Sequence, residues 1–129
     1  RDAAEYFRGQ VNAETIKLLQ NVDNWSKYKH KNAHIDSVYL DQIDVAIGQT
    51  RLLINKKFKQ FLGLCDDCQN GTSQPPVLAK DLEGFWSMVY MQVENCGARF
   101  QKLVTLRDSN WVEPDLMPVK VVKQTKNKK

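Results

Sequence analysis

Residues 46–68 read AIGQTRLLINKKFKQFLGLCDDC, and apolar side chains recur in them at steps of three and four residues. This spacing is typical of an α-helix with one buried face. The pattern begins at Leu40 and stops at Asn70-Gly71, a pair that commonly ends a helix. Asp36 or Ser37 can cap its first turn with a side-chain oxygen. The buried positions predicted for this helix of about seven turns are Leu40, Ile43, Ile47, Ile54, Phe58, Phe61 and Cys65.

Two further helices are predicted, one on each side of this one. The first covers residues 2–25, and the other begins near Asp81 and ends between residues 107 and 110. The polar, basic residues 26–34 are predicted to be a loop, and Pro75-Pro76 marks a linker that cannot be helical. The buried positions predicted for these two helices are Val11, Thr15, Leu18, Val22 and Trp25, and Leu82, Trp86, Val89, Val93, Cys96, Phe100 and Leu103.

Three helices with apolar stripes predict an all-α fold, a three-helix bundle over residues 1–111 onto which Trp111 folds back. Residues 112–129 are predicted to form a basic, mostly disordered tail. They hold five lysines against two carboxylates, and so account for +3 of the chain's net charge of +4. The folded part is therefore nearly neutral, and no strongly basic domain is indicated.

The sequence offers no candidate for catalysis, a cofactor or a metal. Cys65 and Cys68 have a CxxC spacing, but a zinc site needs four ligands, and His30 and His34 lie at the other end of a long helix. Cys65 is therefore predicted to be a core residue. No nucleophile and base are paired, and no glycine loop could hold a phosphate. We expect a non-enzyme with no small-molecule substrate and no cofactor.

Compartment and membrane signals point to the interior of a cell. The chain contains three cysteines, an odd number, and we see no apolar signal sequence in it. Both features indicate reduced thiols, as in proteins of the cytoplasm or nucleus. No apolar run approaches the roughly 20 residues of a membrane-spanning helix. Gly48 and Gly84 lie inside predicted helices, where each is unfavourable, and we expect them to permit close contact between helices.

A second set of apolar residues lies opposite the predicted buried stripes. Val45 and Leu52, with Leu53 nearby, alternate with Gln49 and Lys56. Two interpretations stay open: the middle helix packs against both neighbours, or these residues form a groove for a protein partner. The predicted partner-binding residues are Val45, Gln49, Leu52, Lys56, Met88 and Met91.

Basic residues form two groups that are either solvated surface or electrostatic contacts. The first group lies within residues 51–59, and the second group lies in the tail. An acidic protein surface such as that of microtubules is the favoured partner. Nucleic acid is less favoured, because the tail lacks the interleaved aromatic residues of a single-strand platform. The predicted electrostatic contacts are Arg51, Lys57 and Lys59, and Lys120, Lys123 and Lys126.

Residues 37–111 resemble the homology domain near the C-terminus of the guanylate-kinase-associated proteins, also called discs-large-associated proteins. The family has a mitotic branch, that of the hepatoma up-regulated protein and Mars, and a branch of synaptic scaffolds. Four motifs of this chain look closer to the mitotic branch: GQTRLLI, KFKQF, EGFW and QVEN. The residues that carry the resemblance are Gly48-Gln49 with Leu52-Leu53, Lys57-Phe58 with Gln60-Phe61, Asp81-Leu82 with Gly84-Phe85-Trp86, Glu94, Phe100 and Asn110-Trp111.

The resemblance implies a non-catalytic protein–protein interaction domain of a scaffold or spindle-associated regulator. Its implied partners are microtubules, tubulin or spindle proteins, and its implied location is the cytoplasm, cytoskeleton and mitotic spindle, or the nucleus. Two alternatives stay open. One is a postsynaptic scaffold module that links discs-large-type proteins to partners. The other is an electrostatic module that binds microtubules or nucleic acid. The resemblance assigns no binding residue.

Overall fold

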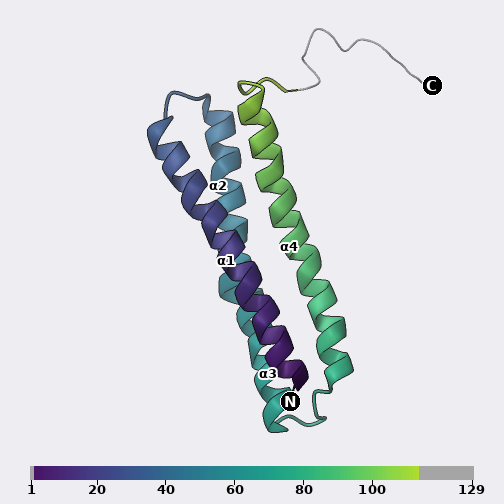
Figure 1. Cartoon of the computed structure of the whole chain (residues 1–129). Helices are drawn as coiled ribbons and strands as arrows, with labels where there is room; N and C mark the ends of the chain where they lie inside the picture. The colour runs from purple at the N-terminus through teal and green to yellow at the C-terminus, as the bar shows by residue number, and fades with distance from the viewer. Residues whose placement is uncertain (1, 114–129) are drawn as a thin grey trace, which may run out of the picture.

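The computed structural model describes residues 2–113 and shows three helical rods side by side, each antiparallel to the next along the chain (Figure 1). No strand occurs in this range, so the predicted all-α three-helix bundle is confirmed. The basic tail, with Lys120, Lys123 and Lys126, lies outside the described residues. The elements are α1 (Asp2–Lys31), α2 (Ser37–Leu52), the π-helix η1 (Leu53–Phe58), α3 (Lys59–Asn70) and α4 (Ala79–Asp108).

The middle rod, α2–η1–α3, changes its helical type at the centre of the bundle. Leu53 and Phe58 are both buried there, with 4% and 1% of their surfaces exposed. In a regular α-helix, two residues five apart point about 140° away from each other. A π-helix bonds residue i to residue i+5, so its wider turn brings both side chains onto one face. The sequence left both a core and a surface position open for Leu52 and Leu53. The structure buries Leu53 and leaves Leu52 54% exposed.

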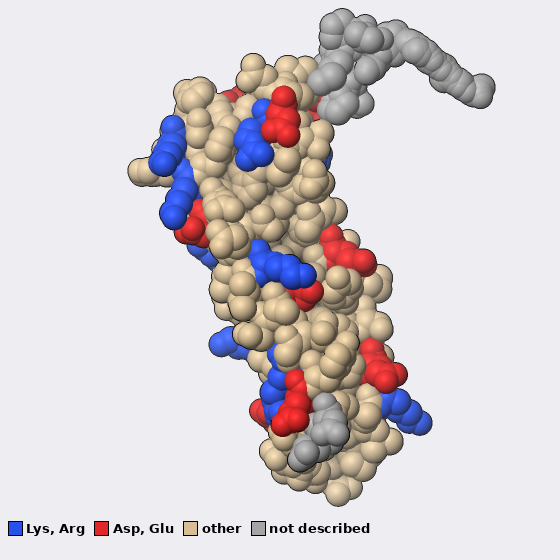
Figure 2. All heavy atoms as spheres, in the orientation of Figure 1, with Lys and Arg blue, Asp and Glu red and all other residues tan. Residues whose placement is uncertain are grey.

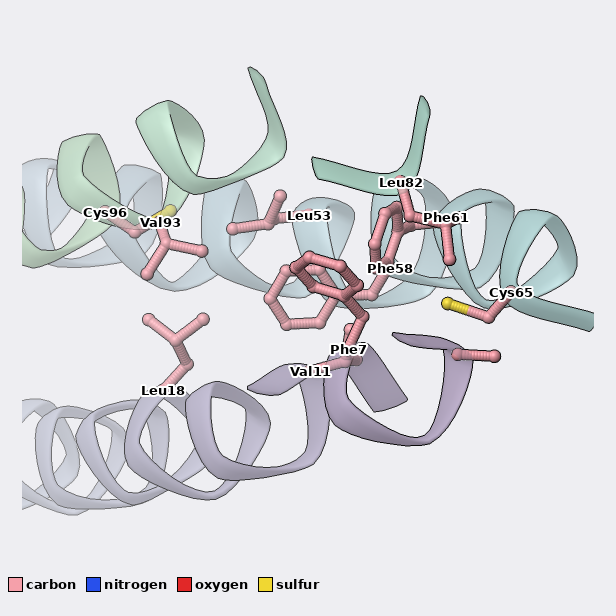
Figure 3. Close-up of a cluster of buried hydrophobic side chains, with 11 residues drawn as sticks. Phe7, Val11, Leu18, Leu53, Phe58, Phe61, Cys65, Leu82, Val93 and Cys96 are labelled. Atoms are coloured by element: carbon pink, nitrogen blue, oxygen red, sulfur yellow. The ribbon is translucent and has the colours of Figure 1, made fainter. Parts of the chain in front are cut away.

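The core consists of two clusters stacked along the bundle. The first cluster joins side chains from α1, from the π-helix and α3, and from the first part of α4. Figure 3 shows Phe7, Phe58, Phe61 and Leu82 converging in this cluster. Trp86 adds an aromatic ring against Phe61, with 5.3 Å between ring centroids. The second cluster joins the other ends of α1, α2 and α4, and consists of Val22, Trp25, Ile43, Ala46, Ile47, Phe100 and Leu103.

Helix α1 continues through residues 26–31, which the sequence analysis predicted to be a loop. Two contacts explain the extension. Tyr28 packs on the ring of Trp25, one turn before it, and the ammonium of Lys29 lies 2.6 Å from the carboxylate of Asp44 on α2. The basic residues of the last turn, Lys29 to Lys31, also complement the negative end of the helix dipole.

The other predicted helix ends are confirmed. The carboxylate of Asp36 accepts a hydrogen bond from the backbone N–H of Val38 at 3.1 Å. Gly71 ends α3 with φ 62°, the left-handed conformation that glycine adopts without a steric penalty. The carboxylate of Asp81 accepts the backbone N–H of Leu78 at 2.9 Å, at the start of α4. The linker that contains Pro75 is not helical.

Trp111 folds back onto the bundle, as predicted. Asn110 and Trp111 both have left-handed backbones, with φ 61° and 65°, and they reverse the chain after α4. The Trp111 indole N–H donates to the Tyr28 hydroxyl at 3.2 Å, and its ring packs near Trp25 and Tyr39. This aromatic group ties the end of α4 to both α1 and α2.

Gly48 and Gly84 do not bring helices together, so that prediction was wrong. Both are exposed, and a Cβ atom added to either would meet nothing within 4 Å. The interior faces are formed by neighbours such as Ile47 and Leu82, which leaves both glycines on the outside. Their unfavourable helix propensity is therefore not offset by packing inside the domain.

We expect Leu53→Ala to lower the free energy of unfolding by about 2–5 kcal/mol, because it leaves a cavity in the core. The matched substitution Leu52→Ala should change it by no more than about 0.5 kcal/mol, because Leu52 lies at the surface. Urea unfolding followed by circular dichroism measures both. Equal losses would contradict the orientation that the π-helix imposes.

We also expect Gly48→Ala and Gly84→Ala each to raise the free energy of unfolding, by roughly 0.5–1 kcal/mol. The space beside each glycine is open, so the added methyl group brings helix propensity without a clash. The same urea titration applies. Destabilisation by either substitution would show that the position is packed against another helix.

Candidate protein-binding groove

A groove runs lengthwise between the middle rod and α4. It consists of three successive hollows with volumes of about 320, 130 and 340 Å³. Neighbouring hollows share lining residues, so they form one continuous surface. Arg99 lines both the first and the second hollow, and Lys57 and Gln92 line both the second and the third. We call this surface the α2–α4 groove, and α1 contributes no residue to it. It is lined by residues 41, 42, 45, 49, 52, 53, 56, 57, 60, 61 and 64 of the middle rod, and by residues 85, 88, 89, 92, 96, 99, 102 and 103 of α4.

Five of the six predicted partner-binding residues lie along this groove. Four of them, Val45, Gln49, Leu52 and Lys56, follow one another on the middle rod at steps of four, three and four, which places them on one ridge. The fifth, Met88, lies on α4 at the other end. Their exposure, 53% for Val45 and 67% for Met88, shows that these side chains are surface rather than core in this structure.

Met91 is the predicted residue that the structure separates from the others. It is 61% exposed but lines none of the three hollows. On α4 the predicted buried residues Val89 and Val93 flank it, so Met91 points away from the bundle.

The α4 side of the groove contains residues that the sequence analysis did not select. Phe85, Gln92, Arg99 and Lys102 line it together with Met88. Phe85 is 41% exposed, although Trp86, its neighbour in the chain, packs against the core cluster. The signal was present in the sequence, because these positions recur at steps of three, four and seven residues on one helix face.

The groove carries positive charge. Lys56, Lys57, Arg99 and Lys102 line it, against one carboxylate, that of Asp41. Within residues 2–113, none of these four cations forms a salt bridge. Outside the groove, five cations of the described residues form salt bridges, among them Arg8 with Asp66 and Lys29 with Asp44. On the face drawn in Figure 2, Lys/Arg and Asp/Glu side chains are interspersed. The groove therefore presents cations that are available to a partner's carboxylates.

The predicted basic cluster at residues 51–59 is not one patch. Lys57 lines the α2–α4 groove, whereas Lys59 lines a separate hollow between α1 and α3 together with Arg8. Arg51 is exposed and lines neither hollow. The helical rotation along the middle rod separates residues that are close in sequence.

The CxxC cysteines have no site around them. Cys65 is completely buried, as predicted, and burial raises the pKa of its thiol, with Arg8 opposing the shift. Cys68 is half-buried. The described part of the chain contains no group of three His, Cys, Asp or Glu residues placed to hold a metal ion. Likewise, no helix between residues 2 and 113 is long and apolar enough to cross a bilayer.

Comparison with known proteins gives one consistent family. A model of the guanylate-kinase-associated protein (GKAP) family matches residues 1–129. The chain is 40% identical over 124 residues to the guanylate kinase-associated protein mars of Drosophila melanogaster, covering 85% of this chain. It is 39% identical over 106 residues to the human Disks large-associated protein 5, covering 82% of this chain.

A third relative, the Disks large-associated protein 1 of Danio rerio, is 33% identical over 103 residues, covering 74% of this chain. These matches span only 14%, 12% and 10% of the lengths of the three relatives. The similarity to mars agrees with the branch that the motifs in residues 48–95 indicated.

We expect Cys68 to react with iodoacetamide faster than Cys65 or Cys96 in the folded protein, by on the order of tenfold or more. Burial excludes the reagent from Cys65, and the raised pKa of that thiol lowers its thiolate fraction at neutral pH. Peptide mapping after timed labelling measures the three rates. Labelling in urea, where all three should react alike, is the control, and rapid labelling of Cys65 in the folded domain would contradict its burial.

Proposed function

The chain belongs to the guanylate-kinase-associated protein family, and from this membership we propose that it is the protein-binding module of a spindle-associated scaffold. The family is one of non-catalytic scaffold proteins that act through protein partners. The finer assignment, to microtubule and mitotic spindle organisation, is supported by the 40% identity to mars and by the motifs GQTRLLI and EGFW. It implies spindle proteins or tubulin as partners, at the cytoskeleton and spindle.

The single observation that supports a binding role for this part of the chain is the α2–α4 groove. Its apolar side chains, among them Val45, Leu52 and Met88, stay exposed although the bundle has a separate, complete core. Exposed apolar side chains that gather in a hollow are typical of protein-binding surfaces. Methionine suits such a surface because its flexible side chain adapts to different partners.

Two other functions are weaker candidates. An electrostatic module that binds the acidic surface of microtubules is favoured by the cations of the groove, such as Lys56 and Arg99, which form no salt bridge with any other residue in the range 2–113. A postsynaptic scaffold module is favoured by the 33% identity to Disks large-associated protein 1, which is lower than that to mars.

A pull-down from mitotic and interphase extracts tests the proposal. The domain should capture tubulin or spindle proteins from mitotic extract, and the double variant Leu52→Asp/Met88→Asp should lose at least about 90% of that capture, because two carboxylates in the hollows disfavour apolar contact. Mass spectrometry identifies and quantifies the captured proteins. Circular dichroism checks that each variant is folded.

Met91→Asp is the matched control, because Met91 is equally exposed but lies outside the groove. It should capture the same proteins as the wild type. Capture of no spindle protein from mitotic extract would overturn the mitotic assignment. Microtubule co-sedimentation that falls steeply with salt and is unchanged in the double variant would instead favour the electrostatic module.

A further inference from the structure

The α2–α4 groove combines two properties. Its walls hold exposed apolar side chains, and its rim holds four cations without carboxylate partners among the described residues. We infer that the groove binds an acidic amphipathic helix of a partner protein. This inference rests on the proposed protein-binding function and specifies the chemistry of its partner.

The shape of the groove fits a helix. Its two walls are themselves helices that lie side by side, antiparallel, along the length of the bundle (Figure 1). On α4 the lining residues extend from Phe85 to Leu103, which at 1.5 Å per residue corresponds to roughly 27 Å. A helix of about 18 residues has the same length, and laid in the groove it would complete a four-helix arrangement. Helices that bind in this way use apolar side chains at steps of three and four residues.

The two ends of the groove differ, so the bound helix has a defined direction. At one end Arg99 and Lys102 face Val45 and one carboxylate, that of Asp41. At the other end Phe85 and Met88 face Leu64 and Phe61, with Lys57 as the cation there. The middle hollow is lined by Lys56, Lys57 and Arg99 and by no carboxylate. The partner helix should therefore carry most of its carboxylates along the middle of the groove, and its bulkiest apolar residues near Met88.

Charge argues against two other occupants. Residues 116–129 of this chain contain five lysines and no carboxylate, so they would be repelled by the cations of the groove. A second copy of the groove would bring together two surfaces that each hold four cations and one carboxylate, so the two copies would repel each other. A flat anionic surface or a nucleic acid would contact the cations but would leave the apolar walls, including Leu52, in water.

Selection from a display library of random peptides of about 20 residues, a length that spans the groove, tests the inference on the full chain. Peptides that bind wild type should be enriched in Glu and Asp, with apolar residues at steps of three and four. Fluorescence anisotropy should show their affinity falling at least about tenfold for Arg99→Glu/Lys102→Glu, and falling as the ionic strength rises. Circular dichroism should show helix formation by the peptide on binding.

Arg51→Glu is the matched control, since Arg51 is an exposed cation that lines no part of the groove, and it should change the affinity less than about twofold. The inference is overturned if the selected peptides are basic, non-helical in the complex or equally strong binders of the charge-reversed variant. It is also overturned if no peptide binds while RNA or anionic vesicles do. Acidic helices that bind in the groove, with no spindle protein captured from extract, would refute the proposed mitotic function and leave this inference standing.

Discussion

The bundle depends on one constraint in the middle rod, whose single apolar face must stay in contact with both α1 and α4 from end to end. Leu53 and Phe58 are five residues apart, a step at which a regular α-helix would turn one of them toward water. The π-helix between them removes this conflict, and both side chains enter the same cluster. Phe58 then packs against Trp86 of α4, with 6.3 Å between ring centroids, and continues the core from α2 into α3.

The same constraint leaves the α2–α4 groove open. Each rod buries one stripe, and within residues 2–113 no further element covers the hollows between the middle rod and α4. Val45, Leu52 and Met88 therefore remain in contact with water after folding is complete. Removing such apolar surface from water is favourable, so the domain keeps a driving force for association. The cations beside them add a preference for a partner of opposite charge.

An aromatic group at one end of the bundle holds together three segments that are far apart in the sequence. Trp111 contacts Trp25 and Tyr28 of α1 as well as Tyr39 of α2. Arg107 of α4 lies over the ring of Trp25, 5.3 Å from its centroid, a distance typical of a cation–π contact. These contacts explain why α1 extends past residue 25 and why the chain turns back after α4.

The sequence alone determined the number of helices, most of their buried residues and all their ends but that of α1, because these follow from local periodicity and from single capping residues such as Asp36 and Gly71. It also indicated a second apolar surface that includes Leu52 and Met88. Only the tertiary structure decided which of the adjacent residues Leu52 and Leu53 faces inward, and that Gly48 and Gly84 face solvent. It also decided that Phe85 and Arg99 share a groove with Leu52, while Met91 does not. The reason is that periodicity fixes the direction of a side chain relative to its own helix, whereas the rotation of that helix against its neighbours depends on how all three pack.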